Sequence, residues 1–455
     1  MFKILYRLTA LALLSAFLFT SCNSDKHKVL LFQKRIKHIV VIYQENWSFD
    51  GLYGNFPGAN NLSKAHLYPQ LNKDGSIMAY APQPYSTIYE KPSVPDSAYF
   101  PSKMPPIPYD LQLYVDHDHQ TGDLIHEFYT EQQQIDGGKM DKFISWSNDG
   151  GLVMSYFDAT NLPEGKLAQQ YTLCDNFFHS AFGGSFLNHI WLVAAASPKW
   201  DNAPGHIISQ PDQSQPNFGY RQVTPDGYVV NTSMSVNEPH PAGMPDSMLV
   251  PNQTMPTIGD ELSAAGVSWK WYSGGWDDAI AGHPDPDFQY HHQPFVYFAN
   301  YKDGTAAKAQ HLQDETQLLR DLGNDSLPEV SFVKPLGHNN EHPGYSNVLR
   351  GQEHVAALVK MIMNSKYWDS TAIIITYDEN GGRWDHAAPP VIDRWGPGTR
   401  VPAIVISPFA RRGYVDHTQY ETTSVLKFIE TRYGLKPLST RDANANDLLN
   451  AFMFY

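Results

Sequence analysis

Apolar residues in this chain gather into short continuous runs that end abruptly in polar residues. The first run, I-K-H-I-V-V-I-Y, covers residues 36–43 and leads into Q-E-N at 44–46. A later run, A-I-I-I-T-Y, covers residues 372–377 and leads into D-E-N at 378–380. Continuous β-branched runs of this length are typical of strands that are buried on both faces of a parallel sheet. We therefore predict two buried strands, each followed directly by acidic and amide side chains.

Strand-like and helix-like patterns alternate through the rest of the chain. In the segment Gln352–Asn364, apolar residues recur at spacing 0, 3, 4 and 7, which predicts one buried face of a helix. This alternation predicts an α/β fold with a mostly parallel central sheet flanked by helices, of the kind built from βαβ units. The other predicted elements are the helices Thr257–Ala265 and Thr423–Tyr433, closed by Gly266 and Gly434, and the strands V-S-W-K-W-Y, P-E-V-S-F-V-K and V-P-A-I-V-I-S.

Two long stretches lack any sustained period. They cover Asn55–Leu111 and Pro198–Pro256, and both are rich in proline. Strand-like runs flank both stretches, so we interpret them as long loop excursions from a single sheet rather than as linkers. This interpretation predicts one domain over residues 36–455.

The first residues have the pattern of an export signal. Lys3 and Arg7 precede the apolar stretch Leu8–Thr20, which is short for a membrane span. We predict a signal peptide over residues 1–21 and a tether over residues 22–35. Small residues before Cys22 are typical of a lipoprotein cleavage site, and ordinary signal cleavage nearby is the alternative. The expected location is outside the bacterial cytoplasm, as a periplasmic, outer-membrane or secreted protein, with lipidated Cys22 as the membrane contact.

Composition narrows the class of partner. The formal net charge is -14, and no lysine- or arginine-rich run is present, so nucleic acid is an unsuitable partner. Hydrophobic residues make up 42% of the chain, which is sufficient for a large core. Cys174 is the one cysteine besides Cys22, and its apolar surroundings predict a buried structural thiol. No pattern indicates an obligate protein partner.

The polar strand ends suit a metal ion. In open α/β sheets, ligands bind beyond the carboxyl ends of the strands, where Glu45 and the pair Asp378-Glu379 are expected. Carboxylate oxygens and the amide oxygen of Asn46 are hard ligands for one divalent cation, whether Mg²⁺, Ca²⁺, Mn²⁺ or Zn²⁺. The alternative is that each acid only caps a following helix or loop.

Ser185 is a candidate nucleophile. It follows two glycines and precedes an apolar, alanine-rich run, so it is expected at the start of a helix. A serine in this position is often only an N-cap. The same position directs free backbone N–H groups at a bound anion, where a serine beside a cation can attack phosphorus. The local sequence leaves these two interpretations open.

Histidine is the other abundant candidate group. The chain has 19 histidines, and many adjoin acids or each other, as in D-H-D-H at 116–119 and H-H at 291–292. A single histidine of this kind most often lies on the surface. Several of them near the strand ends would suit a phosphate site with acid–base chemistry.

Eight motifs occur in an order that resembles the bacterial phosphoesterase family. This family contains phospholipases C and secreted acid phosphatases and belongs to the alkaline-phosphatase-like superfamily. The resemblance extends from about Ile36 to Gly434. The motifs are E-N-W-S-F-D, D-H-D-H, G-G-K-M-D-K-F, C-D-N-F-F-H-S-A-F-G-G-S-F-L-N, H-H-Q-P-F-V-Y-F, N-E-H-P-G-Y, Y-D-E-N-G-G-R-W-D-H-A-A-P-P and V-P-A-I-V-I-S-P.

The resemblance implies roles for individual residues. It implies a metal site with Ser185 as both nucleophile and metal neighbour, histidines at the phosphate, and an outer pair that fastens a loop. The implied metal ligands are Glu45, Asn46, Asp378, Glu379 and Ser185. The implied catalytic residues are Ser185, His119 (from D-x-x-H) and His342. The implied substrate-binding residues are Asn46, Asn188 and His291 or His292, between which the sequence does not choose, and the outer pair is Asp385 and His386.

Three departures from the family pattern influence the expected activity. Trp47 replaces a common arginine, G-G-S-F-L-N replaces the usual G-P-T-x-P-N, and His189 stands where arginine is frequent. Together with H-H-Q-P-F, these changes favour the acid phosphatase branch. The resemblance therefore implies metal-dependent hydrolysis of small phosphate monoesters, of broad specificity, through a phosphoserine intermediate. The alternatives are a phospholipase C-type phosphodiesterase and an inactive phosphate-binding lipoprotein.

Overall fold

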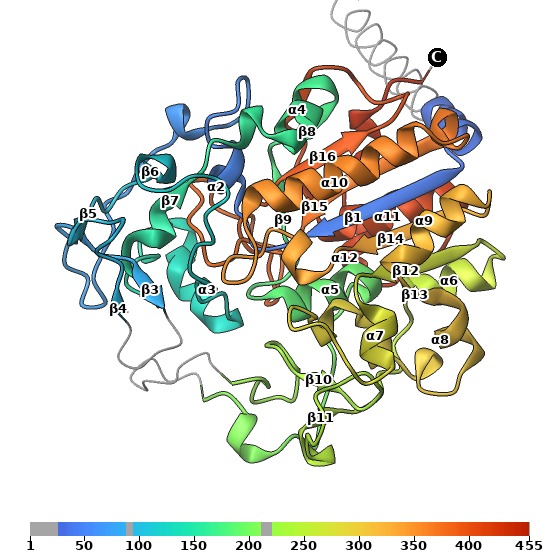
Figure 1. The fold of residues 1–455 in the computed structure, drawn as a ribbon, viewed down its shortest axis with the longest axis horizontal. Coiled ribbons are helices and arrows are strands. Elements are labelled where there is room, and N and C mark those ends of the chain that lie inside the picture. Colours follow the sequence, from blue (N-terminus) through green and yellow to red (C-terminus); the bar gives the residue numbers. More distant parts are fainter. Residues whose placement is uncertain (1–25, 88–93, 211–220, 455) are drawn as a thin grey trace, which may run out of the picture.

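The computed structural model describes residues 26–87, 94–210 and 221–454. Its centre is an eight-stranded sheet whose strand order is β13-β12-β14-β1-β15-β16-β8-β17 (Figure 1). The two runs singled out in the sequence form the adjacent central strands β1 and β15. The strand bounds are β13 Leu312–Asp314, β12 Trp269–Ser273, β14 Val330–Lys334, β1 His38–Gln44, β15 Thr371–Tyr377, β16 Ala403–Ile406, β8 Thr172–Cys174 and β17 Tyr414–Asp416.

Most neighbouring strands run parallel, so the predicted sheet type is confirmed. Parallel pairing joins β13 through β15 and also joins β8 to β17. Strand β16, from the run V-P-A-I-V-I-S, is antiparallel to both β15 and β8. The chain between β15 and β16 contains no helix to carry it back across the sheet, so it returns beside β15 in the opposite direction.

Helices cover both faces of the sheet. Consecutive strand residues point to opposite faces, and the last residues of β1 illustrate this. Tyr43 contacts helix α5 through the Asn188 carbonyl, whereas Gln44 donates to Glu341 on the other face. Helices α4, α9 and α10 cover the Gln44 face, and α5, α6 and α11 cover the Tyr43 face. Their bounds are α4 Pro163–Gln170, α9 Glu315–Gly323, α10 Val348–Met363, α5 Ser185–Ala194, α6 Ile258–Ala264 and α11 Thr422–Tyr433.

The predicted excursions surround one end of this core. The first contains the short strand pairs β2–β5 and β3–β4 and strand β6, and the second contains β10 and β11 (Figure 1). The strands of the excursions are β2 Ala81–Pro82, β3 Tyr85–Thr87, β4 Val94–Pro95, β5 Lys103–Met104, β6 Tyr109–Asp110, β10 Met234–Ser235 and β11 Leu249–Val250. The remaining strands and helices, which lie outside the excursions, are β7 Ser155–Tyr156, β9 Phe177–Phe178, β18 Tyr420–Glu421, α2 Phe49–Tyr53, α3 Phe128–Ile135, α7 Trp276–Ile280, α8 Ala306–His311 and α12 Thr440–Asn444.

The N-terminal segment packs on the domain where the structure describes it. Residues 26–35 are helical, and Phe32 is fully buried against Phe428, with ring centroids 4.6 Å apart. The predicted tether therefore includes a docked helical part. The predicted signal peptide and Cys22 lie outside the described residues. None of the described helices is long and apolar enough to cross a membrane. Cys174 is buried and free, as predicted.

Candidate active site

The two polar strand ends meet, as expected from the sequence. Gln44 at the end of β1 pairs with Tyr377 at the end of β15. Beyond this pair, Asn46 has a left-handed backbone with φ 63° and donates its N–H to Asp378 Oδ1 over 3.1 Å. A glycine is needed opposite, since a Cβ on Gly381 would lie 2.2 Å from the Asn46 carbonyl oxygen. This close approach brings Glu45 and the Asp378-Glu379 pair to one place.

Ser185 lies at the same place, as the first residue of helix α5. Its Oγ lies 3.1 Å from Glu45 Oε2 and 3.4 Å from Asn46 Oδ1. The preceding turn needs glycine, because Gly183 has φ +86° and a Cβ on it would lie 2.5 Å from the Phe128 backbone nitrogen. Ser185 makes no capping hydrogen bond, since Gly184 occupies the N-cap. Its hydroxyl therefore faces the acidic groups rather than its own helix.

The Asn188 side chain forms hydrogen bonds that hold this turn together. Its Oδ1 accepts from the Ala181 N–H over 3.0 Å, and its Nδ2 donates to the carbonyls of Ala181 and Gly183 over 3.0 and 3.2 Å. These bonds use both ends of the amide. Asn188 therefore holds the loop that presents Ser185, a different task from the substrate contact that the family motif implies.

Glu45 is fully buried between Lys334 and His292. Its Oε1 forms an ion pair with Lys334 at the end of β14 and lies 2.9 Å from His292 Nε2. Burial alone would raise the pKa of Glu45, but His292 and Lys334 hold that pKa well below its ordinary value. Burial lowers the pKa of His292 to about 4. At neutral pH the site thus contains an ionised Glu45 paired with Lys334.

The pKa values of Asp378 and Glu379 are shifted in the opposite direction, upward. The pKa of Asp378 is raised to about 7, mainly by burial and secondly by the nearby Glu45 carboxylate. Burial also raises the pKa of Glu379 well above its ordinary value. Asp378 Oδ2 and Glu379 Oε1 are buried oxygens without a hydrogen-bond partner among the described residues. Such carboxylates are costly to ionise without a cation.

These oxygens fit a divalent metal ion. Glu45, Asn46, Asp378, Glu379 and Ser185 carry the hard oxygen atoms that would hold such an ion. In addition, Glu45, His189 and His292 present ligand atoms within 4.8 Å of one another, so imidazole nitrogen is also within reach. Mixed oxygen and nitrogen donors suit Mn²⁺ or Zn²⁺ as well as the hard cations.

Two further imidazoles lie on the other side of Asn46. Its Nδ2 is 3.0 Å from His342 Nε2 and 3.5 Å from His126 Nε2. Burial would lower the pKa of His126, but the carboxylates of Glu379 and Asp123 raise it to about 10. Burial lowers the pKa of His342. At neutral pH the His126 imidazole is therefore charged and the His342 imidazole is neutral. The His126 side chain is 20% exposed.

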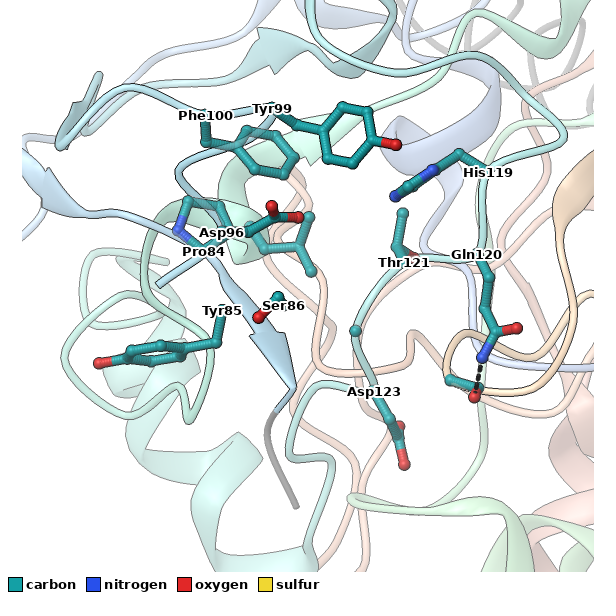
Figure 2. Close-up of a pocket in the computed structure, with 13 residues that line it drawn as sticks. Pro84, Tyr85, Ser86, Asp96, Tyr99, Phe100, His119, Gln120, Thr121 and Asp123 are labelled. Carbon is teal, nitrogen blue, oxygen red and sulfur yellow. Dashed lines mark hydrogen bonds between the residues drawn. The ribbon is translucent and has the colours of Figure 1, made fainter. Parts of the chain in front are cut away.

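His119 is not part of this group. It lines a separate pocket of about 360 Å³ with Tyr99, whose ring centroid is 4.8 Å from its own. In Figure 2 His119 lies beside Tyr99 at one end of the pocket, and Asp123 lies at the other. Both His119 and His126 follow an aspartate by three residues, at Asp116 and Asp123. The structure brings the second D-x-x-H histidine to Asn46, which corrects the placement expected for His119.

The remaining expected residues lie near the site or behind it. His291 is buried with its ring centroid 4.7 Å from that of His292, and it is His292 that contacts Glu45. Asp385 binds Arg400 Nε over 2.9 Å, and His386 Nδ1 lies 2.6 Å from Asp50 Oδ2. Arg400 also binds Asp50. This ion-paired cluster fastens the loop after β15 to helix α2, in keeping with an outer position.

Lys334 and His126 are the groups that sequence reasoning missed. Lys334 is the last residue of a predicted strand, where a lysine ordinarily reaches solvent, yet it is fully buried. Its signal was the apolar run P-E-V-S-F-V-K, whose strand Val330–Lys334 is buried along its whole length. His126 was available through the repeated D-x-x-H spacing. Both are basic groups beside the acids, at a site where Trp47 replaces the arginine common in the family.

Arg383 accounts for the unusual Trp47. The Arg383 guanidinium carbon lies 3.8 Å from the centroid of the Trp47 ring, and both side chains are buried. Arg383 also donates to Ser155 Oγ and Thr121 Oγ1. The indole N–H of Trp47 donates to the Glu341 carbonyl over 3.2 Å. A cation therefore stacks on the residue that replaces the family's arginine.

Comparison with known proteins agrees with this geometry. The Phosphoesterase family model matches residues 36–436. Non-hemolytic phospholipase C of Pseudomonas aeruginosa is 23% identical over 92% of this chain and 58% of its own length. Phospholipase C B of Mycobacterium tuberculosis is 25% identical over 92% of this chain and 78% of its own. The chain thus spans between about half and four fifths of these bacterial relatives.

Solved structures are more distant. A protein in the alkaline phosphatase superfamily from Vibrio parahaemolyticus has a TM-score of 0.35 and 11% identity, over 62% of this chain and 64% of its own. Murine ectonucleotide pyrophosphatase/phosphodiesterase 5 has a TM-score of 0.37 and 9% identity, over 64% of this chain and 94% of its own.

In the described residues, a serine at a helix start thus faces buried carboxylates that lie beyond parallel strands of an α/β fold. The chain belongs to the Phosphoesterase family, whose model covers most of its length.

Proposed function

We propose that the chain hydrolyses phosphodiesters of the phospholipase C type, with Ser185 as its nucleophile. The observation that carries this proposal is the Ser185 hydroxyl, 3.1 Å from the ionised Glu45 at the start of helix α5. The relatives named phospholipase C match 92% of the chain and support a diester over the monoester expected from the sequence. The departures at Trp47 and His189 had favoured the monoester.

In the first step, the bond between phosphorus and one alcohol of the ester is cleaved. Ser185 Oγ attacks phosphorus, its proton passes to Glu45 Oε2, and the bond to the leaving alcohol breaks as the phosphoseryl bond forms. His126, charged at neutral pH, donates a proton to the leaving oxygen. A bound divalent metal ion would supply further positive charge for the developing phosphoryl oxygens. Its ligands would come from Glu45, Asn46, Asp378 and Glu379.

The second step releases a phosphate monoester, because one ester substituent stays on phosphorus. Water attacks phosphorus and gives a proton to His126, the bond from Oγ to phosphorus breaks, and Ser185 recovers its proton from Glu45. His342 and the first N–H groups of helix α5 hold the phosphoryl oxygens. The pocket of about 360 Å³ that includes Asp123 begins next to His126 and gives room for an ester substituent. The first excursion, Asn55–Leu111, supplies Tyr85, Tyr99 and Phe100 to its wall.

The nucleophile is tested with Ser185→Ala. We expect kcat to fall by at least ~10³ while the circular dichroism spectrum is unchanged. Near-normal turnover of this variant would exclude Ser185 as the nucleophile.

The substrate class is tested on one metal-loaded sample. We expect bis-p-nitrophenyl phosphate and phosphatidylcholine to be hydrolysed faster than p-nitrophenyl phosphate. Faster hydrolysis of the monoester would support the acid phosphatase activity instead. Phosphate binding without turnover of any ester would support the inactive binding protein.

We also propose that the protein is exported and anchored through Cys22. The charged residues, apolar stretch and small residues before Cys22 support this proposal. Cys22→Ser should abolish incorporation of labelled fatty acid and release the protein from the membrane fraction. Unchanged labelling would contradict the anchor.

A further inference from the structure

Two glutamates are buried together on the face of the sheet opposite Ser185. Glu164 lies in the first turn of α4, and Glu341 lies in the loop before α10. Both side chains are 0% exposed. Tyr377, the last residue of β15, reaches both, with its hydroxyl oxygen 2.8 Å from Glu341 Oε1 and 3.2 Å from Glu164 Oε2. The proposed mechanism assigns no role to this pair.

This group has too few hydrogen-bond donors to satisfy two ionised carboxylates. Tyr377 has one hydroxyl hydrogen, so it can donate to only one of the two oxygens that it contacts. Gln44 donates to Glu341 Oε1 over 3.0 Å. In residues 26–87, 94–210 and 221–454, neither glutamate forms an ion pair with lysine, arginine or histidine. The contact of Tyr377 with Glu164 therefore requires a hydrogen on the carboxyl itself.

The surrounding residues are polar but uncharged. Gln352 of α10 accepts the Glu164 N–H over 3.1 Å, and Tyr53 of α2 is buried against both acids. The groups facing the pair from every element packed against it are thus Gln44 of β1, Tyr53 of α2, Gln352 of α10 and Tyr377 of β15. Two neighbouring carboxylates in such surroundings cannot both be ionised at modest cost.

We propose that Glu164 and Glu341 share a single proton, and that this carboxyl–carboxylate pair positions the loop that carries His342. Glu341 has a left-handed backbone with φ 73°, which is strained for a residue with a side chain. Its side chain is tied to the ends of both central strands, through Gln44 of β1 and Tyr377 of β15. The next residue, His342, lies 3.0 Å from the Asn46 amide.

The alternation of strand residues explains why this pair acts on the site. Gln44 and Tyr377 point to the pair, whereas the next residues, Glu45 and Asp378, point to Ser185 and His189. A shift of the pair would therefore move both strand ends and His342 at once. Glu164 and Glu341 are positioning residues, because they act through these neighbours. Burial raises the pKa of Glu341 to about 8 and raises that of Glu164 well above its ordinary value, which agrees with a retained proton.

The test compares Glu164→Gln with Glu164→Leu in the full chain. A carboxamide can donate a hydrogen bond as the protonated carboxyl does, whereas leucine cannot. We expect Glu164→Gln to keep kcat within about threefold of the wild type and Glu164→Leu to lose about tenfold or more, with KM changing less. Glu430→Gln is the matched control, because Glu430 is also buried with a raised pKa but lies in α11. It should leave kcat unchanged.

A second measurement does not need activity. A carboxyl whose pKa is raised in the folded state favours folding at low pH, so its contribution to stability decreases as the pH rises from about 4.5 to about 8. The wild-type Tm should therefore decrease more between pH 5 and pH 8 than the Tm of Glu164→Gln. Equal pH dependence in the two proteins, or a Glu164→Gln kcat as low as that of Glu164→Leu, would overturn the shared proton.

This inference rests on the proposed function only for its kinetic part. If no ester is hydrolysed even by the wild type, the proposed function fails, and the Tm comparison still decides whether the proton is shared. A Tm that depends on added Na⁺ or K⁺ at fixed pH, and not on pH, would show a bound cation in place of the proton.

Discussion

At the scale of single residues, two histidines have the same local sequence signal. His119 and His126 each follow an aspartate by three residues, and the sequence alone offers no ground for choosing between them. Their surroundings differ, since His126 lies 3.8 Å from Glu379 Oε1 whereas His119 packs on the exposed Tyr99. Position relative to the strand ends, which depends on tertiary structure, distinguishes them.

His126→Ala should lower kcat by about 10² or more, because the leaving oxygen loses its proton donor. The matched change His119→Ala should alter kcat by no more than about threefold and act mainly on KM, since His119 lines the adjacent pocket. Steady-state kinetics on a soluble diester measure both. A larger effect on kcat from His119 than from His126 would contradict this assignment.

Lys334 is the second residue whose role depends on tertiary structure. It is fully buried and forms an ion pair with Glu45. Removing one partner of a buried pair leaves the other charge without compensation. Lys334→Met should therefore destabilise the chelated protein by about 3 kcal/mol in urea unfolding. The loss should be smaller in metal-loaded protein, where the cation compensates Glu45. An equal loss in both samples would argue against a metal beside Glu45.

At the scale of elements, the apolar pattern predicted most of the core. The predicted helix Thr257–Ala265 is observed as α6, capped by Thr257, and Thr423–Tyr433 is observed as α11. Helix α10 begins four residues before the predicted Gln352, because Asn347 caps it and Val348 starts its buried face. Capping and periodicity are local, so a sequence reports them. The direction of β16 is not local, and the prediction missed it.

The stacking of Arg383 on Trp47 joins the loop after β15 to the loop after β1. Trp47→Arg would restore the residue common in the family but would bury a second guanidinium against Arg383. We expect this change to lower the free energy of unfolding by at least about 3 kcal/mol. Trp47→Phe is the control, since it keeps an aromatic face for the guanidinium and loses only the hydrogen bond to the Glu341 carbonyl. It should cost about 1 kcal/mol. A Trp47→Arg protein as stable as the Phe variant would show that Arg383 moves away.

At the scale of the whole molecule, the site depends on segments far apart in the chain. Glu45, Ser185, Lys334 and Asp378 come from four different elements and meet only because β1 lies between β14 and β15. The sequence predicted the acids through the strand ends that precede them. It could not predict that Lys334 and His126 lie beside these acids, because the burial of Lys334 and the position of His126 depend on tertiary packing.

The cluster of acids also predicts how metal binding depends on pH. In the metal-free protein the pKa of Asp378 is raised to about 7 from 3.8, and that of Glu379 is raised well above its ordinary value. The folded state thus retains protons that the unfolded chain releases, so metal-free stability falls as the pH rises from about 4 through 7. Glu45 has the opposite shift and titrates below this range.

A metal ion must displace the retained protons, so it should bind more weakly at low pH. We expect the apparent Kd for Mn²⁺ to be at least about tenfold lower at pH 8 than at pH 5. The rise in Tm on adding metal should likewise be larger at pH 8. Isothermal titration and thermal unfolding of chelated protein measure the two effects. Asp378→Asn is the control, because it removes one titrating carboxyl and should reduce the pH dependence of whatever binding remains. The same Kd at both pH values would mean that the metal does not contact these carboxylates.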